Sequence, residues 1–328
     1  MQYTPLGRTG VTVSRLCMGT MTFGREADDA TSAALYRAAR EAGITFFDCA
    51  NLYANGRSEE ILGRLIADER DDLVITSKVG MPLEGDDPNR QGLSRRHIMD
   101  QVERSLRRLG TDRLDVYFCH RDDAATPMDE SLRAMDDLVR HGKVRYVGVS
   151  NWPAWHTARG LGICGRAGLA PIHVIQPMYS LIKRTAEIEI LPHARAEGLG
   201  VVTYSPLGGG VLTGKYLARG KPKRARLTEH EMYARRYADR TYHRIAKTFC
   251  THAEEAGVHP ATLAVAWVMA HPAVTAPIVG ARTVEQLAPS LAAAEYAMTA
   301  DAWSALSALT PPVPVATDRD EERQESYT

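Results

Sequence analysis

The 328-residue sequence predicts an α/β protein folded as one parallel (β/α)8 TIM barrel. Short apolar segments typical of buried strands alternate with amphipathic segments typical of helices, and eight such pairs fill about 300 residues. An open, doubly wound sheet is the main alternative, because alternation alone does not close a barrel. No linker or repeat interrupts the pattern. We therefore expect one domain over residues 1–310 and a flexible tail over residues 311–328, which are Pro-rich and then highly charged.

The expected elements follow in chain order. Residues 2–15 predict a small β-hairpin around Gly7 and Gly10. The eight strands are expected near residues 16–20, 45–49, 73–78, 114–119, 144–149, 173–177, 200–204 and 275–279. The helices after them are expected near residues 30–43, 57–68, 94–109, 128–141, 153–160, 186–197, 240–257 and 283–294. Outside this pattern lie two extra helices, near 260–270 and 300–309, and a loop rich in Gly, Lys and Arg between Leu207 and Arg240, which is either functional or a solvated basic loop.

The composition argues against several classes of partner. Lys+Arg and Asp+Glu both count 40, so no excess charge indicates nucleic acid or an acidic membrane surface. No apolar run approaches the roughly 18 residues of a membrane-spanning helix. The five cysteines are scattered and form no C-x-x-C pair, which favours reduced thiols in a cytoplasmic protein over disulfides or a zinc cage. We expect no nucleic-acid partner, no membrane partner and no metal.

Three successive strands are expected to end in ionisable residues. Asp48, Lys78 and His120 end the second, third and fourth strands, and Tyr53 lies in a polar loop five positions after Asp48. The carboxyl ends of barrel strands share one rim, so these side chains are expected to meet in one cleft. A carboxylate beside a phenol makes chemical sense if the phenol must give up a proton. Taken separately, the same residues could form a structural ion pair, a strand-end histidine and a packing tyrosine.

These four residues resemble the catalytic tetrad of the aldo-keto reductases in order, spacing and flanking sequence, with similarity to the branch that includes potassium-channel β subunits. The resemblance implies that Tyr53 donates a proton to the substrate oxygen and that His120 orients the carbonyl. A free phenol titrates near ~10, and a neighbouring Lys78 ammonium is expected to lower that pKa. Asp48 is expected to keep the lysine charged and oriented.

Further segments resemble the cofactor site of the same family. The segment from Tyr204 to Tyr216 is similar to the loop that closes over the cofactor phosphates, and Gly148–Asn151 and Gln176 resemble the positions beside the nicotinamide. The cofactor contacts that the resemblance implies are Gly19, Thr20, Met21, Asp48, Ser150, Asn151, Gln176, Tyr204, Ser205, Pro206, Leu207, Gly210, Lys215, Gly280, Arg282 and Gln286.

The last strand and its helix, residues 278–286, resemble the site of the adenosine phosphate. A helix N-terminus beside Gly280 and Arg282 is a ready anion site, and Arg282 favours NADPH over NADH. Pro289 and Ser290 depart from the Glu-Asn pair that is common in the family. The adenine contacts and the strictness of the cofactor preference are therefore left open.

Three other features have competing explanations. Residues 160–165 fit the spacing G-x-G-x-x-G, but they follow a helical pattern and not a strand, which argues against a dinucleotide site. Asp122 and Asp123 are either solvated loop carboxylates or a polar mouth for a hydroxylated substrate such as a sugar. Trp152 and Trp155 are expected to pack within a helix, and the substrate cleft is the alternative place for Trp152.

The sequence thus predicts an NADPH-dependent oxidoreductase that reduces an aldehyde or ketone, among them sugars and other hydroxylated carbonyls. One alternative is a dehydrogenase of a sugar or alcohol acting through the same site. The other is a cofactor-binding regulatory subunit resembling the β subunits of potassium channels. The sequence leaves open the substrate, the physiological direction, the oligomeric state and whether the C-terminal tail covers the site.

Overall fold

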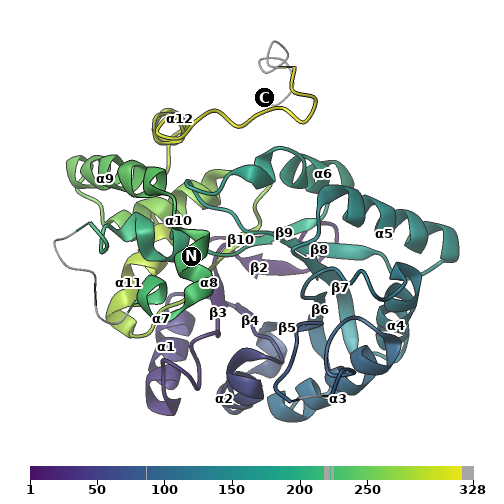
Figure 1. The fold of residues 1–328 in the computed structure, drawn as a ribbon. Helices are drawn as coiled ribbons and strands as arrows, with labels where there is room; N and C mark the ends of the chain where they lie inside the picture. The colour runs from purple at the N-terminus through teal and green to yellow at the C-terminus, as the bar shows by residue number, and fades with distance from the viewer. Residues whose placement is uncertain (86, 218–221, 223–224, 320–328) are drawn as a thin grey trace.

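The computed structural model describes residues 1–85, 87–217, 222 and 225–319. Eight parallel strands form a closed barrel, in which each pairs with the next along the chain and the last pairs with the first (Figure 1). The closed barrel is confirmed and the open sheet is excluded. The strands lie where the sequence predicts them: β3 (Cys17–Gly19), β4 (Phe46–Asp48), β5 (Val74–Val79), β6 (Leu114–Cys119), β7 (Val144–Ser150), β8 (Ile172–Gln176), β9 (Gly200–Thr203) and β10 (Ala276–Val279).

Helices surround the barrel (Figure 1). Those of the expected outer ring are α1 (Asp29–Glu41), α2 (Arg57–Ile66), α3 (Arg95–Leu109), α4 (Met128–Arg140), α5 (Ala154–Ala167), α6 (Ile190–Glu197), α9 (Arg240–Glu255) and α11 (Val284–Leu291). The two predicted extra helices are present as α10 (Pro260–Ala270) and α12 (Ala300–Ser307). Short 3-10 turns are η1 (Tyr53–Gly56), η2 (Arg70–Asp72), η3 (Thr185–Glu187), η4 (Gly208–Thr213) and η5 (Ala292–Ala294).

Two expectations about local structure need correction. Helix α5 runs to Ala167 and not to residue 160, so the G-x-G-x-x-G spacing lies inside a helix and cannot form a phosphate-binding turn. The expected loop from Leu207 to Arg240 is partly helical, because it contains η4, α7 (Arg226–Glu229) and α8 (Glu231–Arg236). Residues 218–221 and 223–224 of that stretch lie outside the described residues.

The predicted N-terminal hairpin, β1 (Tyr3–Pro5) and β2 (Thr12–Ser14), closes the amino-terminal end of the barrel. Its side chains Leu6 and Val13 belong to the same buried cluster as the residues that fill the barrel interior, which are Cys17, Phe46, Val74, Val116, Phe118, Val174, Val202 and Ala276. A Cβ at Gly7 would lie 2.3 Å from the backbone nitrogen of Gly200, so this tight turn requires glycine. Only the carboxyl ends of the strands are left open for a site.

A larger apolar layer lies between the strands and the helices. Alternation along each strand sends one set of side chains inward and the other outward. Cys49 and Cys119 accordingly join the outer layer, while Asp48 points toward the rim. All five cysteines are free thiols. The barrel interior and the layer between strands and helices together hold the strand ends in fixed positions around the rim.

No helix in the described part of the chain is long and apolar enough to cross a membrane. Residues 311–319 carry no helix or strand, and residues 320–328 of the expected tail lie outside the described residues. The flexibility of the tail and the single domain over residues 1–310 stay predictions.

The barrel interior generates a prediction about stability. The ring of Phe118 is fully buried and lies so close to Gly148 that a Cβ there would be 2.5 Å from the ring. Because Phe118→Ala leaves a cavity that neighbouring strands cannot collapse to fill, we expect a loss of about 3–5 kcal/mol in the free energy of unfolding. Urea denaturation followed by circular dichroism measures it.

The matched control is Phe118→Leu, which keeps most of the volume and should cost less than about 1.5 kcal/mol. A cost below about 1 kcal/mol for Phe118→Ala would contradict the description of this side chain as part of a close-packed interior.

Candidate active site

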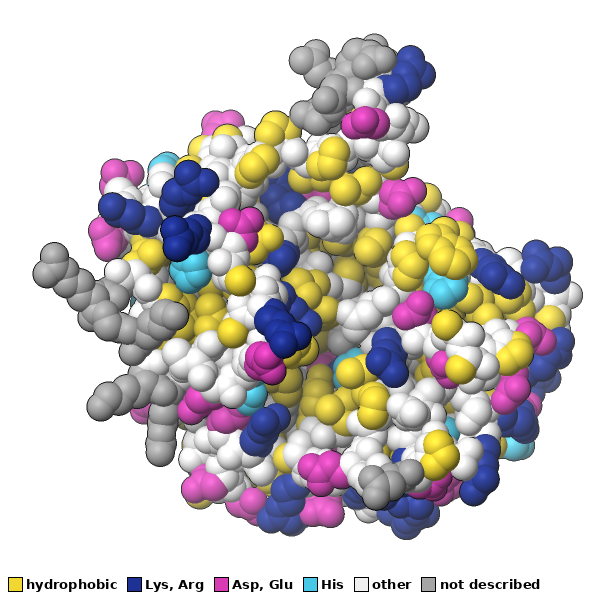
Figure 2. Space-filling model, in the orientation of Figure 1, with side chains coloured by type: hydrophobic (Ala, Val, Ile, Leu, Met, Phe, Trp, Pro, Cys, Tyr) yellow, Lys and Arg dark blue, Asp and Glu magenta, His cyan; other side chains and the backbone are white. Residues whose placement is uncertain are grey.

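A cleft of about 780 Å³ opens at the carboxyl ends of the barrel strands. Figure 2 shows a hollow near the middle of this face, with Lys and Arg side chains beside it. All the site residues expected from the sequence line this cleft except Thr20 and Lys78, which are fully buried beneath its surface. The residues that line it as expected are Gly19, Met21, Asp48, Tyr53, His120, Ser150, Asn151, Gln176, Tyr204, Ser205, Pro206, Leu207, Gly210, Lys215, Gly280, Arg282 and Gln286.

Lys78, on β5, is the centre of the hydrogen-bond network at the floor of the cleft. Its side chain is 0% exposed, and its ammonium donates to three oxygens. These are Asp48 Oδ2 at 2.5 Å, the carbonyl oxygen of Cys49 at 2.7 Å and the phenol oxygen of Tyr53 at 3.2 Å. Every ammonium hydrogen therefore has an acceptor, as a buried charge requires.

The carboxylate of Asp48 is held from two further strands. Its Oδ1 accepts hydrogen bonds from Thr76 Oγ1 on β5 and from Gln176 Nε2 on β8, both at 2.9 Å. Sequence analysis did not single out Thr76, although its place two positions before Lys78 on the same face of β5 indicates this contact. Thr20, expected as a cofactor contact, instead donates to the carbonyl oxygen of Asp48 from below.

The pKa values at the floor follow from burial and from these partners. Burial disfavours the charged form of Lys78, yet Asp48 raises the pKa of the lysine above its ordinary value. Burial also raises the pKa of the Tyr53 phenol to about 12; Lys78 opposes this shift and Asp48 adds to it. Lys78 thus acts on the phenol pKa in the expected direction, but burial, which the expectation did not include, outweighs it. The phenol keeps its proton at neutral pH.

His120 stands against Tyr53 at the end of β6. The two ring centroids are 6.2 Å apart and the rings are nearly perpendicular, at 80°. Burial, followed by the positive charges of Lys78 and Arg121, lowers the pKa of His120 well below its ordinary value of 6.5. The imidazole is therefore neutral at neutral pH. Its Nδ1 has no hydrogen-bond partner among the described residues.

A polar wall lies at the ends of β7, β8 and β9. Asn151 adopts a left-handed conformation with φ of 59°, which is uncommon for a residue other than glycine. Its amide nitrogen donates to the carbonyl oxygen of His120 at 2.9 Å, and its amide oxygen accepts from the hydroxyl of Tyr204 at 2.7 Å. Ser150 donates to the carbonyl oxygen of Gln176 at 2.9 Å. These bonds lock the strand ends into one rigid surface.

Positive charges gather at the other end of the cleft. Burial lowers the pKa of Lys215, and repulsion from Arg226 and Arg282 lowers it further. Cations that repel one another in a common cleft are typical of an anion-binding site. Arg282 is partly neutralised, because it pairs with Glu229 at 2.5 Å and lies 3.9 Å from Glu26. These residues fit the phosphate groups of a dinucleotide.

Helices α7 and α8 also supply lining residues at the positive end of the cleft, which were not predicted as site residues. The guanidinium carbons of Arg226 and Arg236 each lie over the Tyr233 ring, 5.2 Å from its centroid, and Met232 also lines the cleft. Only the basic composition of the stretch pointed to them. Pro289, inside α11 as expected, lines the cleft with Ser290, whereas residues 311–319 of the tail contribute nothing to the lining.

The chain is similar in sequence to several known proteins. Residues 15–310 match the sequence model of the Aldo/keto reductase family. The chain is 40% identical over 326 residues to "Uncharacterized oxidoreductase YrpG" of Bacillus subtilis, which covers 95% of this chain and 96% of that protein. It is 40% identical over 301 residues to "Probable voltage-gated potassium channel subunit beta" of Oryza sativa, covering 89% and 91%. It is 32% identical over 338 residues to "Protein tas" of Escherichia coli, covering 94% and 97%.

The buried ion pair of Lys78 and Asp48 predicts that a single substitution strongly lowers the free energy of unfolding. In Asp48→Asn, the Lys78 ammonium loses its countercharge while still buried, so we expect a loss of about 3–5 kcal/mol in the free energy of unfolding. Adding Lys78→Met should recover much of the loss, because no unpaired charge then remains. Thermal and urea unfolding measure both.

The control is Asp29→Asn, which breaks exposed ion pairs with Arg57 and Arg64 and should cost about 1 kcal/mol or less. If Asp48→Asn proved as mild as this surface change, Lys78 would not carry a buried charge.

Proposed function

Because the chain belongs to the aldo/keto reductase family of oxidoreductases, we propose that it reduces the carbonyl group of an aldehyde or ketone to an alcohol with NADPH. The observation that carries this proposal is the contact of the Tyr53 phenol with a buried, paired Lys78 at the floor of the cleft. A phenol placed on a buried ammonium is suited to give up a proton and to hold the negative charge that remains.

The residues of the cleft support a dinucleotide as the cofactor. NADPH, when bound, supplies the hydride that adds to the carbonyl carbon. Ser150, Asn151 and Gln176 offer amide and hydroxyl groups to its carboxamide, and the ring of Tyr204 offers a face to its nicotinamide. The positive end of the cleft, with Lys215, suits the pyrophosphate. The other residues that the family resemblance implies as cofactor contacts would line the rest of the space that the dinucleotide occupies.

Arg282 is the residue through which the site would favour NADPH over NADH. Its guanidinium is suited to a 2′-phosphate, and the start of α11 beside it adds backbone donors. The ion pair with Glu229 competes for the same group. A phosphate that binds Arg282 must therefore displace or share this carboxylate.

The proton comes from Tyr53. As hydride addition places negative charge on the carbonyl oxygen, the phenol Oη transfers its proton to that oxygen and the alcohol is complete. The phenolate is then stabilised by Lys78 Nζ, which Asp48 keeps charged, and it recovers a proton from water. A general acid of this kind contributes roughly 10²–10⁴-fold in rate.

His120 orients the substrate. A neutral imidazole can donate one N–H to the carbonyl oxygen without competing with Tyr53 as the acid. The same groups run in reverse would oxidise an alcohol, so a sugar or alcohol dehydrogenase uses no different site. Substrate access is bounded by Leu52, Met81 and Arg121.

A regulatory, cofactor-binding subunit is the second candidate, because a rice protein that is 40% identical is named as a potassium channel β subunit. NADPH oxidation measured against a panel of aldehydes and keto-sugars separates the two functions. Turnover of at least one compound supports the reductase. Tight NADPH binding without turnover of any compound supports the regulatory subunit.

Removing the proton donor gives a direct test of its role. Tyr53→Phe keeps the ring but loses the hydroxyl, so we expect kcat to fall by about 10²–10⁴-fold while the Kd for NADPH changes little. Steady-state kinetics and cofactor fluorescence titration measure the two quantities.

The matched control is Tyr146→Phe. That hydroxyl donates to the carbonyl oxygen of Thr9 at the closed end of the barrel, so its loss should leave kcat unchanged. Wild-type turnover in Tyr53→Phe would overturn the assignment of Tyr53 as the acid.

The shifted pKa values predict a flat pH profile for reduction. The pKa of Tyr53, raised to about 12, keeps the donor protonated, and the pKa of His120, lowered below 6.5, keeps the imidazole neutral. We expect kcat/KM for reduction to stay level between about pH 6 and pH 8. An inflection near 6.5 that disappears in His120→Asn would show that this imidazole titrates in the working range.

We expect the preference for NADPH over NADH to depend on Arg282. Arg282→Ala should weaken NADPH binding by about 10–100-fold, the value of one charged hydrogen bond, with little effect on NADH. Glu229→Gln should tighten NADPH binding, because it frees the guanidinium from its ion pair. Fluorescence titration with both cofactors measures these changes.

Arg244→Ala, an exposed arginine on α9, is the matched control and should change neither affinity. An equal loss for NADPH and NADH in Arg282→Ala would mean that this side chain does not contact a 2′-phosphate.

A further inference from the structure

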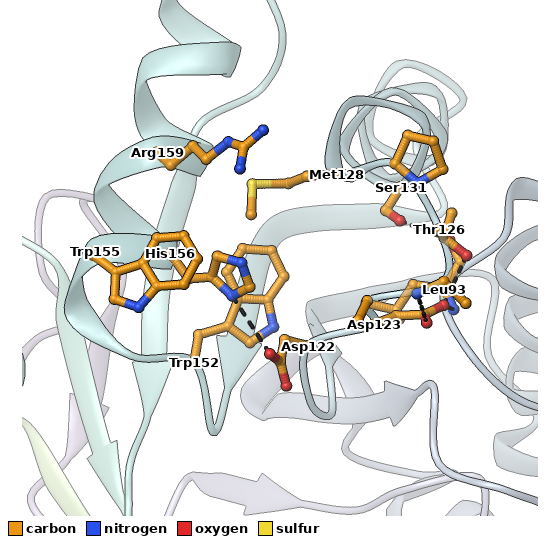
Figure 3. Close-up of a pocket in the computed structure, with 13 residues that line it drawn as sticks. Leu93, Asp122, Asp123, Thr126, Met128, Ser131, Trp152, Trp155, His156 and Arg159 are labelled. Atoms are coloured by element: carbon orange, nitrogen blue, oxygen red, sulfur yellow. Dashed lines mark hydrogen bonds and ion pairs between the residues drawn. The ribbon is translucent and has the colours of Figure 1, made fainter.

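A second cavity, of about 530 Å³, lies beside the catalytic cleft between the loop after β6 and the first turns of α4 and α5 (Figure 3). Residues adjacent in the sequence line the two cavities. His120 and Arg121 line the catalytic cleft and Asp122 lines the second cavity; Asn151 lines the cleft and Trp152 the second cavity. The proposed reduction makes no use of this space.

One side of the second cavity carries three aromatic rings in contact, those of Trp152, His156 and Trp155. The ring centroids of Trp155 and His156 are 4.0 Å apart, and those of Trp152 and His156 are 5.5 Å apart. Figure 3 shows the three rings grouped on one side, with the Met128 side chain extending toward them. Trp155 is 60% exposed, so the expectation that it packs within its helix is wrong. His156 lies against one face of its indole, and the exposed remainder is a flat apolar surface.

Asp122 is the polar group of this cavity that is available to a ligand, whereas the indole N–H of Trp152 is enclosed by protein. The indole N–H of Trp152 is buried in a side chain only 6% exposed, yet it has no acceptor among the described residues. Asp122 makes one weak contact, from its Oδ2 to Nδ1 of His156 at 3.5 Å (Figure 3).

The sequence left open whether Asp122 and Asp123 are loop carboxylates or groups that meet a hydroxylated ligand. Asp123 differs from Asp122 in this respect. Its carboxylate accepts from the backbone N–H of Leu93 and of Ala125, at 2.7 Å and 3.0 Å, and from the hydroxyl of Thr126 at 2.7 Å. Asp123 therefore builds the loop. Asp122 is the carboxylate left free to receive a ligand hydroxyl.

We propose that this cavity binds a neutral sugar ring, as a free sugar or a glycoside, at a site separate from the reduction. The C–H face of a pyranose stacks on the indole of Trp155. One hydroxyl of the ring donates to the carboxylate of Asp122. The lining holds two carboxylates and one guanidinium, but loop donors occupy Asp123, so a ligand meets Asp122 and Arg159, a pair of opposite charges that suits a neutral molecule.

The probe for the test is methyl β-D-glucopyranoside, which has no free carbonyl and cannot be reduced. Saturation-transfer NMR with the full chain, in the presence of NADPH, should show saturable binding. Sorbitol, an open-chain polyol with no ring to stack, should bind at least tenfold more weakly. Equal binding of the two compounds, or no binding of the glucoside, would overturn the proposal.

Variants locate the binding. Trp155→Ala and Asp122→Asn should each weaken it at least tenfold, whereas Trp155→Phe, which keeps an aromatic face, should retain most of it. The surface change Asp301→Asn is the matched control for Asp122→Asn and should have no effect. Circular dichroism confirms that each variant is folded.

Tyr53→Phe distinguishes this site from the catalytic cleft. Binding of the glucoside should be unchanged in Tyr53→Phe whether or not the chain reduces carbonyls, so failure of the proposed reductase function leaves this result intact. Loss of binding in Tyr53→Phe, with full binding in Trp155→Ala, would place the sugar in the catalytic cleft and contradict the proposal.

Discussion

The ammonium of Lys78 is a charge buried without any exposure, and the floor of the cleft is arranged around it. Taking such a charge out of water costs several kcal/mol unless each hydrogen finds an acceptor and a countercharge lies nearby. Asp48, the carbonyl oxygen of Cys49 and the phenol of Tyr53 satisfy that requirement. Since these partners come from β4 and the segment after it, the requirement also fixes where that segment runs.

The hydrogen-bond network extends beyond Lys78 and Asp48 and joins opposite parts of the barrel. Gln176 reaches Asp48 from β8, while Asn151 connects the ends of β6, β7 and β9 through His120 and Tyr204. The rim is therefore braced by side-chain hydrogen bonds across its width, and the apolar interior below fixes the strands. Such rigidity suits a site that must place a proton donor and an anion-binding region at a set separation.

The strands, most helices and the meeting of Asp48, Lys78 and His120 at one rim could be predicted, because apolar periodicity locates strands and parallel strands share a carboxyl end. The raised pKa of Tyr53 could not be predicted, since it depends on how completely the fold excludes water from the phenol. The contact of Gln176 with Asp48 could not be predicted either, because it joins strands on different sides of the barrel and has no signature in local sequence spacing. The exposure of Trp155 depends on how α5 is set against the loop of Asp122, which periodicity does not determine.

The central claim is that Lys78 acts on the reaction through the phenol of Tyr53. A double-mutant cycle of Lys78→Met and Tyr53→Phe, followed by kcat for NADPH-dependent reduction, tests it most directly. If the lysine works through the phenol, the double variant will be no slower than Tyr53→Phe alone. If the two losses multiply, Lys78 contributes independently of Tyr53 and the account is wrong.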